Sequence, residues 1–167
     1  MKKVLVTGAT GFVGSYVVAD LLSRGLSVIA TSSDEKKAAA FNWFNEVRYL
    51  PFDFNTFDNK VNYFEYFERP DIAIHLAWEG LPNYKDSFHL EKNLPLHQAV
   101  LENLVRNGLR NLTVTGTCFE YGMKAGKLSE STPADPANAY AIAKHRLQQF
   151  LSELTNRYQC SFKWVRL

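Results

Sequence analysis

Tyr140 and Lys144 carry the clearest chemical signal in the sequence. They are four residues apart, a spacing that brings two side chains together on one face of a helix. A free tyrosine has a pKa near ~10 and is a poor base at neutral pH. A neighbouring ammonium group favours the phenolate and allows proton exchange with a hydroxyl or carbonyl oxygen. Tyr140 is the only one of the eight tyrosines followed by a lysine at this distance, and the pair predicts acid–base catalysis.

Three glycines, Gly8, Gly11 and Gly14, lie between a predicted strand and a predicted helix. In that context the first glycine permits a tight turn, the second lets the backbone approach a pyrophosphate, and the third lets the helix pack closely on the strand. The unpaired amides and the dipole at the helix N-terminus favour bound phosphates. The segment therefore predicts a pyrophosphate-binding loop.

These residues must be positioned by an alternation of short β-branched strands and longer segments of helical period, which is typical of a parallel sheet covered by helices. We expect strands over residues 2–7, 26–31, 47–52, 71–77 and 111–115, with a further strand in the final run 162–167. We expect helices over residues 11–24, 34–45, 60–68, 87–107 and 139–158. Pro95 must kink or break the fourth helix, and residues 122–138 are expected to form a functional loop. The fold class is α/β, a doubly wound parallel sheet with helices on both faces.

Apolar periodicity predicts which face of two helices is buried. In the first helix the stripe consists of Val13, Val17, Leu21 and Leu22. In the last helix it consists of Ile142, Leu147, Phe150, Leu151 and Leu154.

Composition excludes several classes of protein. The 167 residues, 46% of them hydrophobic, fit one globular domain rather than a disordered chain. A net charge of +2 is too weak to indicate nucleic-acid binding, and no apolar run approaches the ~18 residues of a membrane span. Cys118 and Cys160 form neither a disulfide framework nor a metal site, so a reducing cytoplasm is expected. Cys118 could serve as a proton donor, but it is expected first of all to be a small buried thiol.

The segment TGxxGxxG at residues 7–14 resembles that of the short-chain dehydrogenase/reductase superfamily, and the rest of the chain is similar to its extended branch. That branch contains nucleotide-sugar epimerases, dehydratases and 4-ketoreductases. The resemblance covers the whole chain and implies a Rossmann fold with an NAD(P) cofactor.

The resemblance also implies a third catalytic residue. Relatives carry a Ser or Thr five residues before the glycine that ends the fifth-strand segment, and here that residue is Thr117. Its hydroxyl would position the reacting oxygen beside Tyr140 while the nicotinamide exchanges a hydride with the same carbon. Glu130, Pro133 and Pro136 resemble the family's approach to the catalytic tyrosine. The predicted catalytic set is Thr117, Tyr140 and Lys144.

The cofactor-binding residues are implied by the same resemblance and follow the carboxyl ends of successive strands, where doubly wound sheets bind ligands. Asp53 resembles the acid that bonds the adenine amino group, and Asn93 resembles the asparagine near the nicotinamide ribose. Trp78 stands where many relatives have glycine. Like His75 it is expected first of all to pack, while residues 78–87 could also line the sugar site. The full predicted set is Gly8, Thr10, Gly11, Phe12, Val13, Gly14, Ser32, Ser33, Asp53, Phe54, Leu76, Ala77, Trp78, Asn93, Thr115, Tyr140 and Lys144.

The end of the second strand bears on the choice of cofactor. Ser32 falls where relatives that prefer NAD carry an aspartate, and two hydroxyls followed by Lys36 and Lys37 suit a 2′-phosphate. Asp34 keeps NAD(H) open. NADP(H) is the favoured prediction, and no metal is predicted.

The residues after Thr117 bear on the reaction. Relatives that eliminate water carry Asp-Glu there, whereas this chain has Cys118-Phe119. The favoured prediction is reduction of a nucleotide-linked 4-keto-6-deoxyhexose at C4. The alternatives are a nucleotide-sugar 4-epimerase with bound NAD and a non-catalytic NADP-binding regulator.

Two further expectations rest on the resemblance alone. The helices near residues 87–107 and 140–157 are expected to pair with their copies in a homodimer. The final strand leads, in relatives, into a substrate-binding lobe. We therefore expect residues 1–167 to be the cofactor-binding portion of a longer enzyme, able to bind cofactor but poor in turnover.

Overall fold

Strands and helices alternate along the computed structural model, which describes residues 2–167. The strands are β1 (Lys3–Thr7), β2 (Ser27–Thr31), β3 (Arg48–Tyr49), β4 (Ile72–His75), β5 (Asn111–Gly116) and β6 (Ser161–Arg166). The α-helices are α1 (Phe12–Ser23), α2 (Glu35–Ala39), α3 (Tyr63–Tyr66), α4 (Leu94–Arg106) and α5 (Ala139–Arg157). Shorter helical turns are η1 (Phe44–Glu46), η2 (Phe54–Thr56), the π-helical η3 (His89–Asn93) and η4 (Cys118–Tyr121).

All six strands form one parallel sheet in the order β3-β2-β1-β4-β5-β6. Val4 of β1 is paired with Val28 on one side and Ile72 on the other. The chain adds strands outward from β1 in one direction and then, from β4, in the other. Ligands of such sheets bind at the carboxyl ends of the strands where the order reverses, so the fold predicts a site between β1 and β4. The predicted doubly wound α/β fold is confirmed.

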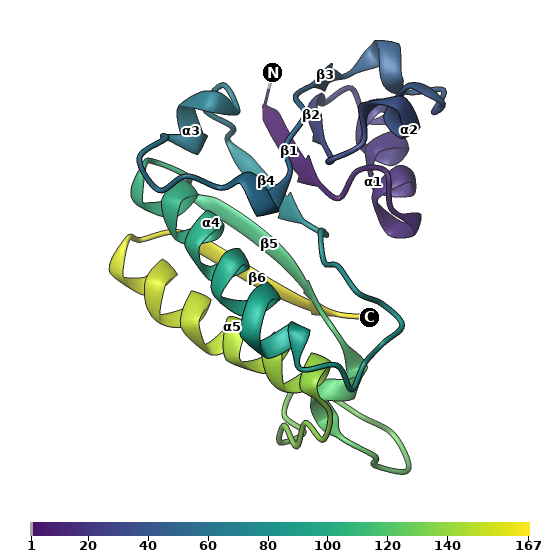
Figure 1. Cartoon of the computed structure of the whole chain (residues 1–167), viewed down its shortest axis with the longest axis vertical. Helices are drawn as coiled ribbons and strands as arrows, with labels where there is room; N and C mark the ends of the chain where they lie inside the picture. Colours follow the sequence, from purple (N-terminus) through teal and green to yellow (C-terminus); the bar gives the residue numbers. More distant parts are fainter. Residues whose placement is uncertain (1) are drawn as a thin grey trace.

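Alternate residues of β1 belong to separate cores on the two faces of the sheet, and Figure 1 shows α4 and α5 in front of β5 and β6. Val4 and Val6 pack with residues of α1 and α2, whereas Leu5 packs with residues of α4 and α5. The helices therefore cover both faces, as predicted. On the α1 face they cover only the half of the sheet that holds β1 to β3, and Val165 of β6 is 43% exposed there.

Three elements in the first half are shorter than predicted. The helix expected over 34–45 stops at Ala39 and is followed by η1. The helix expected over 60–68 is confined to α3, because Asn62 caps its start and Glu68 takes a positive φ after it. The strand expected over 47–52 has only two residues, although the backbone nitrogens of Leu50 and Phe52 still donate to Ala30 and Ser32.

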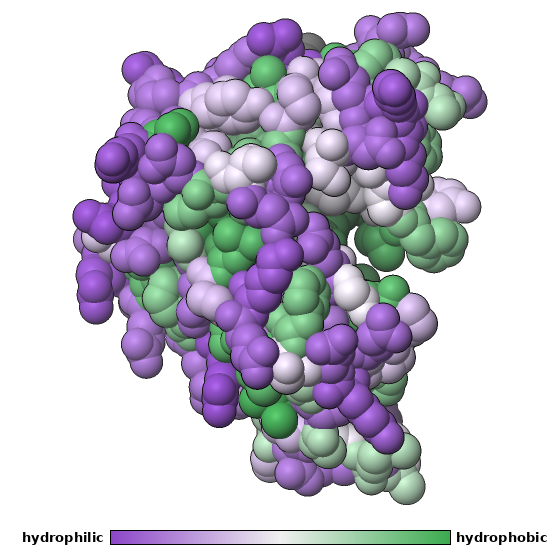
Figure 2. Space-filling view, in the orientation of Figure 1, coloured by the Kyte–Doolittle hydropathy of each residue, from purple (hydrophilic) through white to green (hydrophobic). Residues whose placement is uncertain are grey.

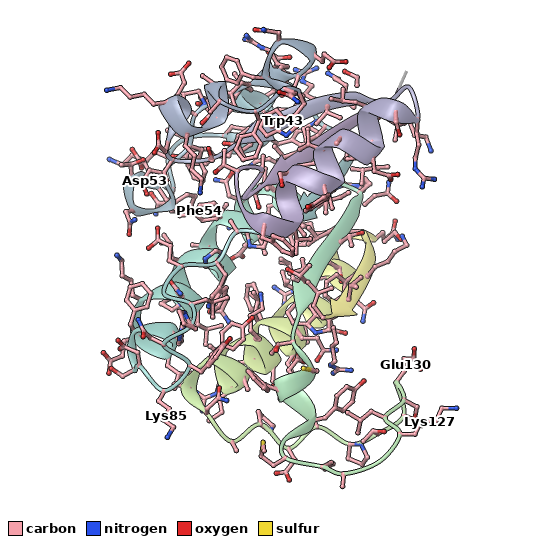
Figure 3. All side chains as sticks on the ribbon, turned by 90° about the vertical axis from the view of Figure 1, so that its right-hand side faces the viewer. Trp43, Asp53, Phe54, Lys85, Lys127 and Glu130 are labelled. Carbon is pink, nitrogen blue, oxygen red and sulfur yellow. The ribbon has the colours of Figure 1, made fainter. Side chains whose placement is uncertain are left out.

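The helix expected over 87–107 does not break at Pro95. The π-helical turn η3 runs directly into α4, because Asn93 and Leu94 both keep right-handed helical backbone angles. The turn η3 buries His89 and Asn93, and Pro95 follows in the first turn of α4. Residues 122–138 contain no helix or strand, and Lys127 and Glu130 on this loop project away from the body of the protein (Figure 3).

The buried stripe of α5 is largely as predicted, but that of α1 is not. Val13 is 37% exposed and Val18 is buried instead. The first turn of α1 lies at the carboxyl edge of the sheet, so its side chains have no strand to pack on. In residues 2–167 no helix has the length and apolar character needed to cross a membrane.

Candidate active site

Two hollows lie at the carboxyl ends of the strands and meet at Gly8 and Trp78. The one beside β2, called here the β2 hollow, is lined by Gly8, Thr10, Ser32, Ser33, Phe52, Asp53, Phe54, Ala77, Trp78, Glu79, Asn93, Leu96 and His97. The one beside β5, called here the β5 hollow, is lined by Gly8, Gly11, Phe12, Val13, Gly14, Leu76, Trp78, Leu81, Thr115, Gly116, Thr117, Tyr140, Lys144 and Leu167. Every residue predicted to bind the cofactor or to catalyse lines one of the two.

The hollows open between the two halves of the molecule. Figure 2 shows the surface indented on its right-hand side, between the half that holds α1 and the half that holds α5. Figure 3 faces this side, with Asp53 and Phe54 at the lower edge of the upper half. A single extended ligand could therefore lie across both hollows.

The glycine loop has the close packing that its spacing predicts. Gly8 has φ +70°, and a Cβ there would lie 2.8 Å from the backbone nitrogen of Ala77. A Cβ on Gly14 would lie 2.1 Å from the carbonyl oxygen of Gly8, a distance that no side chain tolerates. Both positions require glycine because a neighbouring backbone occupies the space.

The N-terminus of α1 is open to an anion. Its N-cap is Gly11, which has no side chain to satisfy the first amides, and its first turn contains no acidic residue. The N–H groups of Phe12 and Val13 lie in the first turn, where the helix itself offers no acceptor. Because the helix dipole also favours negative charge there, a pyrophosphate fits this end of the β5 hollow.

Asn93 presents a second unsatisfied group. Its side-chain nitrogen donates to the backbone oxygen of Glu79 at 3.0 Å, while its Oδ1 is buried and has no partner within residues 2–167. A buried acceptor without a donor is costly. Since Asn93 lines the β2 hollow, a ligand hydroxyl such as that of a ribose fits this position.

The far end of the β2 hollow carries hydroxyls and capping carboxylates. The Ser32 hydroxyl lies 2.9 Å from that of Tyr49. Asp34 accepts from the backbone nitrogen of Lys37 and so caps α2, and Asp53 accepts from the backbone of Asn55. Asp34 is thus engaged by its own helix, whereas Asp53 lines the hollow directly.

Tyr140 is a buried phenol at the floor of the β5 hollow. Burial raises its pKa to about 12, and the nearby Thr117 hydroxyl partly offsets that rise. Tyr140 is therefore protonated at neutral pH. The strand end that carries Thr117 and the helix that carries Tyr140 bring the two hydroxyls together from positions distant in sequence.

Lys144 is a buried cation held by aromatic rings. Its side chain is almost fully buried, and burial lowers its pKa to about 7. The Nζ atom lies 4.4 Å from the centre of the Trp78 ring and 5.6 Å from that of Trp164. Cation–π attraction compensates part of the lost hydration.

Trp78 both packs and lines the site. Its ring stacks on His97 at 4.6 Å and meets Tyr140 edge-on at 6.0 Å, and its Nε1 donates to His89. His75 is fully buried, as predicted, and bonds Thr7 and His97. Burial lowers the pKa of His75 to about 3, so the ring is neutral.

His97 and Glu120 are among the residues of this region that sequence reasoning missed, and Cys118 was wrongly described. His97 lines the β2 hollow, and Glu120 is a fully buried carboxylate next to Thr117. The spacing Thr117-x-x-Glu120, typical of a capping box, could have identified Glu120. The prediction that Cys118 is buried is wrong. Cys118 is exposed because it begins the turn η4 on the outer side of the site.

The chain matches known proteins over nearly its whole length. The family described as NAD dependent epimerase/dehydratase matches residues 4–167. The dTDP-6-deoxy-L-talose 4-dehydrogenase (NAD(+)) of Aggregatibacter actinomycetemcomitans is 31% identical over 164 residues, which are 98% of this chain and 59% of that protein. The UDP-glucose 4-epimerase of Neisseria meningitidis serogroup C is 26% identical over 169 residues, covering 92% of this chain and 48% of that protein.

Solved structures share the fold. A UDP-glucose 4-epimerase from Brucella ovis in complex with NAD superimposes with a TM-score of 0.83 at 19% identity, covering 99% of this chain and 51% of that one. The chain thus spans about half the length of the proteins that it matches. In the part of the chain that the structure describes, no group of three or more His, Cys, Asp or Glu is placed to hold a metal ion.

Proposed function

Because the chain belongs to the NAD dependent epimerase/dehydratase family, we propose that it binds a nicotinamide dinucleotide across the β2 and β5 hollows and reduces or oxidises a nucleotide-linked sugar there. The observation that carries this proposal is the convergence of Thr117, Tyr140 and Lys144 on the hollow that also contains the glycine loop. A non-catalytic regulator would not need this set.

The proposed cofactor-holding residues follow from the unsatisfied groups. The amides of Phe12 and Val13 would take the pyrophosphate, Asn93 Oδ1 would accept from a ribose hydroxyl, and Asp53 would bond the adenine amino group. When bound, the nicotinamide supplies or accepts the hydride.

The chain's own residues would handle the proton. Tyr140, with its pKa raised to about 12 by burial, holds its proton at neutral pH and can donate it from Oη to an oxygen that gains negative charge. Thr117 would hold that oxygen within reach of Tyr140. Lys144, when protonated, adds positive charge that favours the phenolate left behind.

We further propose that the sugar is a 4-keto-6-deoxyhexose, reduced at C4. Support comes from the similarity to a dTDP-6-deoxy-L-talose 4-dehydrogenase, because oxidation at C4 of a 6-deoxyhexose is the reverse of such a reduction. The protonated state of Tyr140 also suits the reductive direction. Elimination of water is disfavoured, because Phe119 packs edge-on against Tyr84 and the nearest acid, Glu120, is sequestered by its own partners.

A nucleotide-sugar 4-epimerase that retains NAD is the second candidate, and the relatives with that name favour it. The two are separated by the fate of the cofactor. When the protein is incubated with a nucleotide-linked 4-keto-6-deoxyhexose and reduced cofactor, the absorbance of the cofactor at 340 nm should fall. The Tyr140→Phe variant should not show this fall. Interconversion of UDP-sugars without net redox would overturn the reductase in favour of the epimerase.

We propose NADP(H) as the preferred cofactor. Ser32 and Ser33 line the β2 hollow where a carboxylate would repel a 2′-phosphate, and Asp34 is engaged in capping α2. The name of the talose dehydrogenase relative, which specifies NAD(+), favours the alternative. Because Trp78 lines both hollows, quenching of its fluorescence by NADPH and by NADH measures the two affinities, with Trp78→Phe as the control. Tighter binding of NADH would overturn the preference.

A homodimer through α4 and α5 is also proposed. The two helices pack against each other on one face of the sheet, and Figure 2 shows apolar and polar residues intermixed on their outer surface. Sedimentation at micromolar concentration should give twice the chain mass of 19.0 kDa. A monomer at all concentrations would contradict the proposal.

A further inference from the structure

Glu120 is a fully buried carboxylate that makes an unusually complete set of bonds. One oxygen accepts from the backbone nitrogen of Thr117 at 2.8 Å, and both accept from the indole nitrogen of Trp164 at 3.0 and 3.2 Å. The second oxygen also accepts from Arg166 at 3.1 Å. A buried charge is costly unless it is paired and hydrogen-bonded, so this arrangement is a built feature of the site.

The Glu120 carboxylate holds the backbone of Thr117 in place. Glu120 and Thr117 form a capping box, in which the Thr117 hydroxyl accepts from the backbone nitrogen of Phe119 while Glu120 holds the Thr117 backbone. Because it accepts from Phe119, the Thr117 hydroxyl keeps its hydrogen available to donate, and Tyr140 lines the same hollow.

The Glu120 carboxylate is tightly packed against the backbone of Gly116 and the ring of Trp164. A Cβ on Gly116 would lie 2.4 Å from Glu120 Oε1 and 2.2 Å from the Trp164 indole nitrogen. The residue before Thr117 must therefore be glycine for the carboxylate to approach this strand end. The bonds to Trp164 and Arg166 tie the same point to β6, the edge strand of the sheet.

Trp164 lies between Glu120 and Lys144, because its indole nitrogen donates to Glu120 while its ring centre is 5.6 Å from Lys144 Nζ. The charge of Glu120 therefore acts on Lys144 across this ring. Burial lowers the pKa of Lys144, and the negative charge of Glu120 opposes that effect. The other titratable groups facing this region are Tyr140 on the same helix and His75 and His97 from β4 and α4, both kept neutral by burial. Around Glu120 itself lie Arg166 and His145, whose Nδ1 is 3.9 Å from Oε2.

We propose that Glu120 is the positioning residue of this site: it fixes the Thr117 hydroxyl through the backbone and supplies the counter-charge that keeps the buried Lys144 ammonium in place. The catalytic part of this inference rests on the proposed function, whereas its electrostatic part does not.

The test compares Glu120→Gln with Glu130→Gln in the full chain. Glutamine keeps the size of the side chain and removes its charge, and Glu130 is an exposed residue of the 122–138 loop (Figure 3). The Cε resonance of Lys144, in protein labelled with ¹³C-lysine and assigned with Lys144→Met, reports its titration midpoint. Glu120→Gln should lower that midpoint by several tenths of a pH unit, and Glu130→Gln should leave it unchanged. An unchanged midpoint in Glu120→Gln overturns the proposal.

A second variant distinguishes an effect of the Glu120 charge from an effect of its structural role. It also provides a test if Glu120→Gln does not fold. Arg166→Met removes the cation that partly neutralises Glu120, so it should raise the Lys144 midpoint, opposite to Glu120→Gln. If Glu120 had a purely structural role, the two variants would not shift the Lys144 midpoint in opposite directions. A midpoint that is lowered or unchanged in Arg166→Met overturns the proposal.

Kinetics provide the catalytic readout. With a sugar substrate that the wild type reduces, Glu120→Gln should lower kcat by about 10- to 100-fold with little change in KM, because Thr117 is misplaced rather than removed. An unchanged kcat overturns the positioning role. If the wild type reduces no such sugar, the proposed function fails, and the Lys144 titration still decides the electrostatic role of Glu120.

Discussion

Gly14→Ala tests whether the close approach of α1 to the glycine loop is what builds the cofactor site. The new Cβ would lie 2.1 Å from the carbonyl oxygen of Gly8, whereas real Cβ contacts stay above 3.0 Å, so α1 must move by about 1 Å. A contact this short should cost about 2–3 kcal/mol, the upper part of the usual range for overpacking, and replacing a helical glycine by alanine returns about 1 kcal/mol. We expect a net loss of about 1–2 kcal/mol, or roughly 2–8 °C in Tm for a chain of this size.

Gly25→Ala is the matched control. Gly25 has φ +72° and no atom within 4 Å of the added Cβ, so its loss is backbone strain of about 1–2 kcal/mol without a clash. The two variants should be similarly destabilised in urea. Only Gly14→Ala should weaken NADPH binding, by at least about tenfold, because only there do the amides at the start of α1 move. Gly11→Ala, whose Cβ would lie 3.2 Å from the same oxygen, should have a smaller effect on binding.

Two results would refute this reasoning. One is a Gly14→Ala protein as stable as the wild type, which would mean that α1 does not rest on the Gly8 carbonyl. The other is equal loss of cofactor binding in Gly14→Ala and Gly25→Ala, which would tie binding to global stability rather than to the position of α1. Circular dichroism in urea and tryptophan fluorescence quenching provide the two measurements.

Three further predictions follow from the site. Tyr140→Phe keeps the buried ring but removes the proton donor, so it should lower the rate of sugar reduction by about 10²–10⁴-fold and leave NADPH affinity unchanged; equal rates would contradict the acid role. Lys144→Met should flatten the pH dependence of stability. Between pH 7 and 10.5 the unfolded chain holds a lysine proton that the folded chain has released, so the free energy of unfolding of the wild type, measured in urea, rises with pH. An equal rise in the variant would show that other groups cause it. Ser32→Asp should move the ratio of NADPH to NADH affinity toward NADH by at least about tenfold, and a ratio that does not move would mean that Ser32 is not at the 2′ position.

The local patterns of the sequence predicted the fold, and they named candidate residues that the structure gathers at two hollows. Spacing in the glycine loop, the Tyr140–Lys144 offset and the alternation of strands and helices each depend on a few neighbouring residues. The alternation is confirmed by the observed sheet, whereas the roles of the site residues stay predictions. Short elements were predicted poorly. α3 is limited by a cap at Asn62 and by the positive φ of Glu68, and such local terminators compete with periodicity over only a few residues.

What only the tertiary structure decided is the environment of each group. The sequence placed Tyr140 and Lys144 on one helical face, but their pKa values depend on burial beneath Trp78 and beside Thr117, contributed by other elements. It named Cys118 as buried, although the turn direction of η4 exposes it. The role of Glu120 depends on Trp164 and Arg166, more than 40 residues away in the chain. Spacing along a chain fixes which neighbours share a face, whereas desolvation and charge pairing arise only when distant segments pack together.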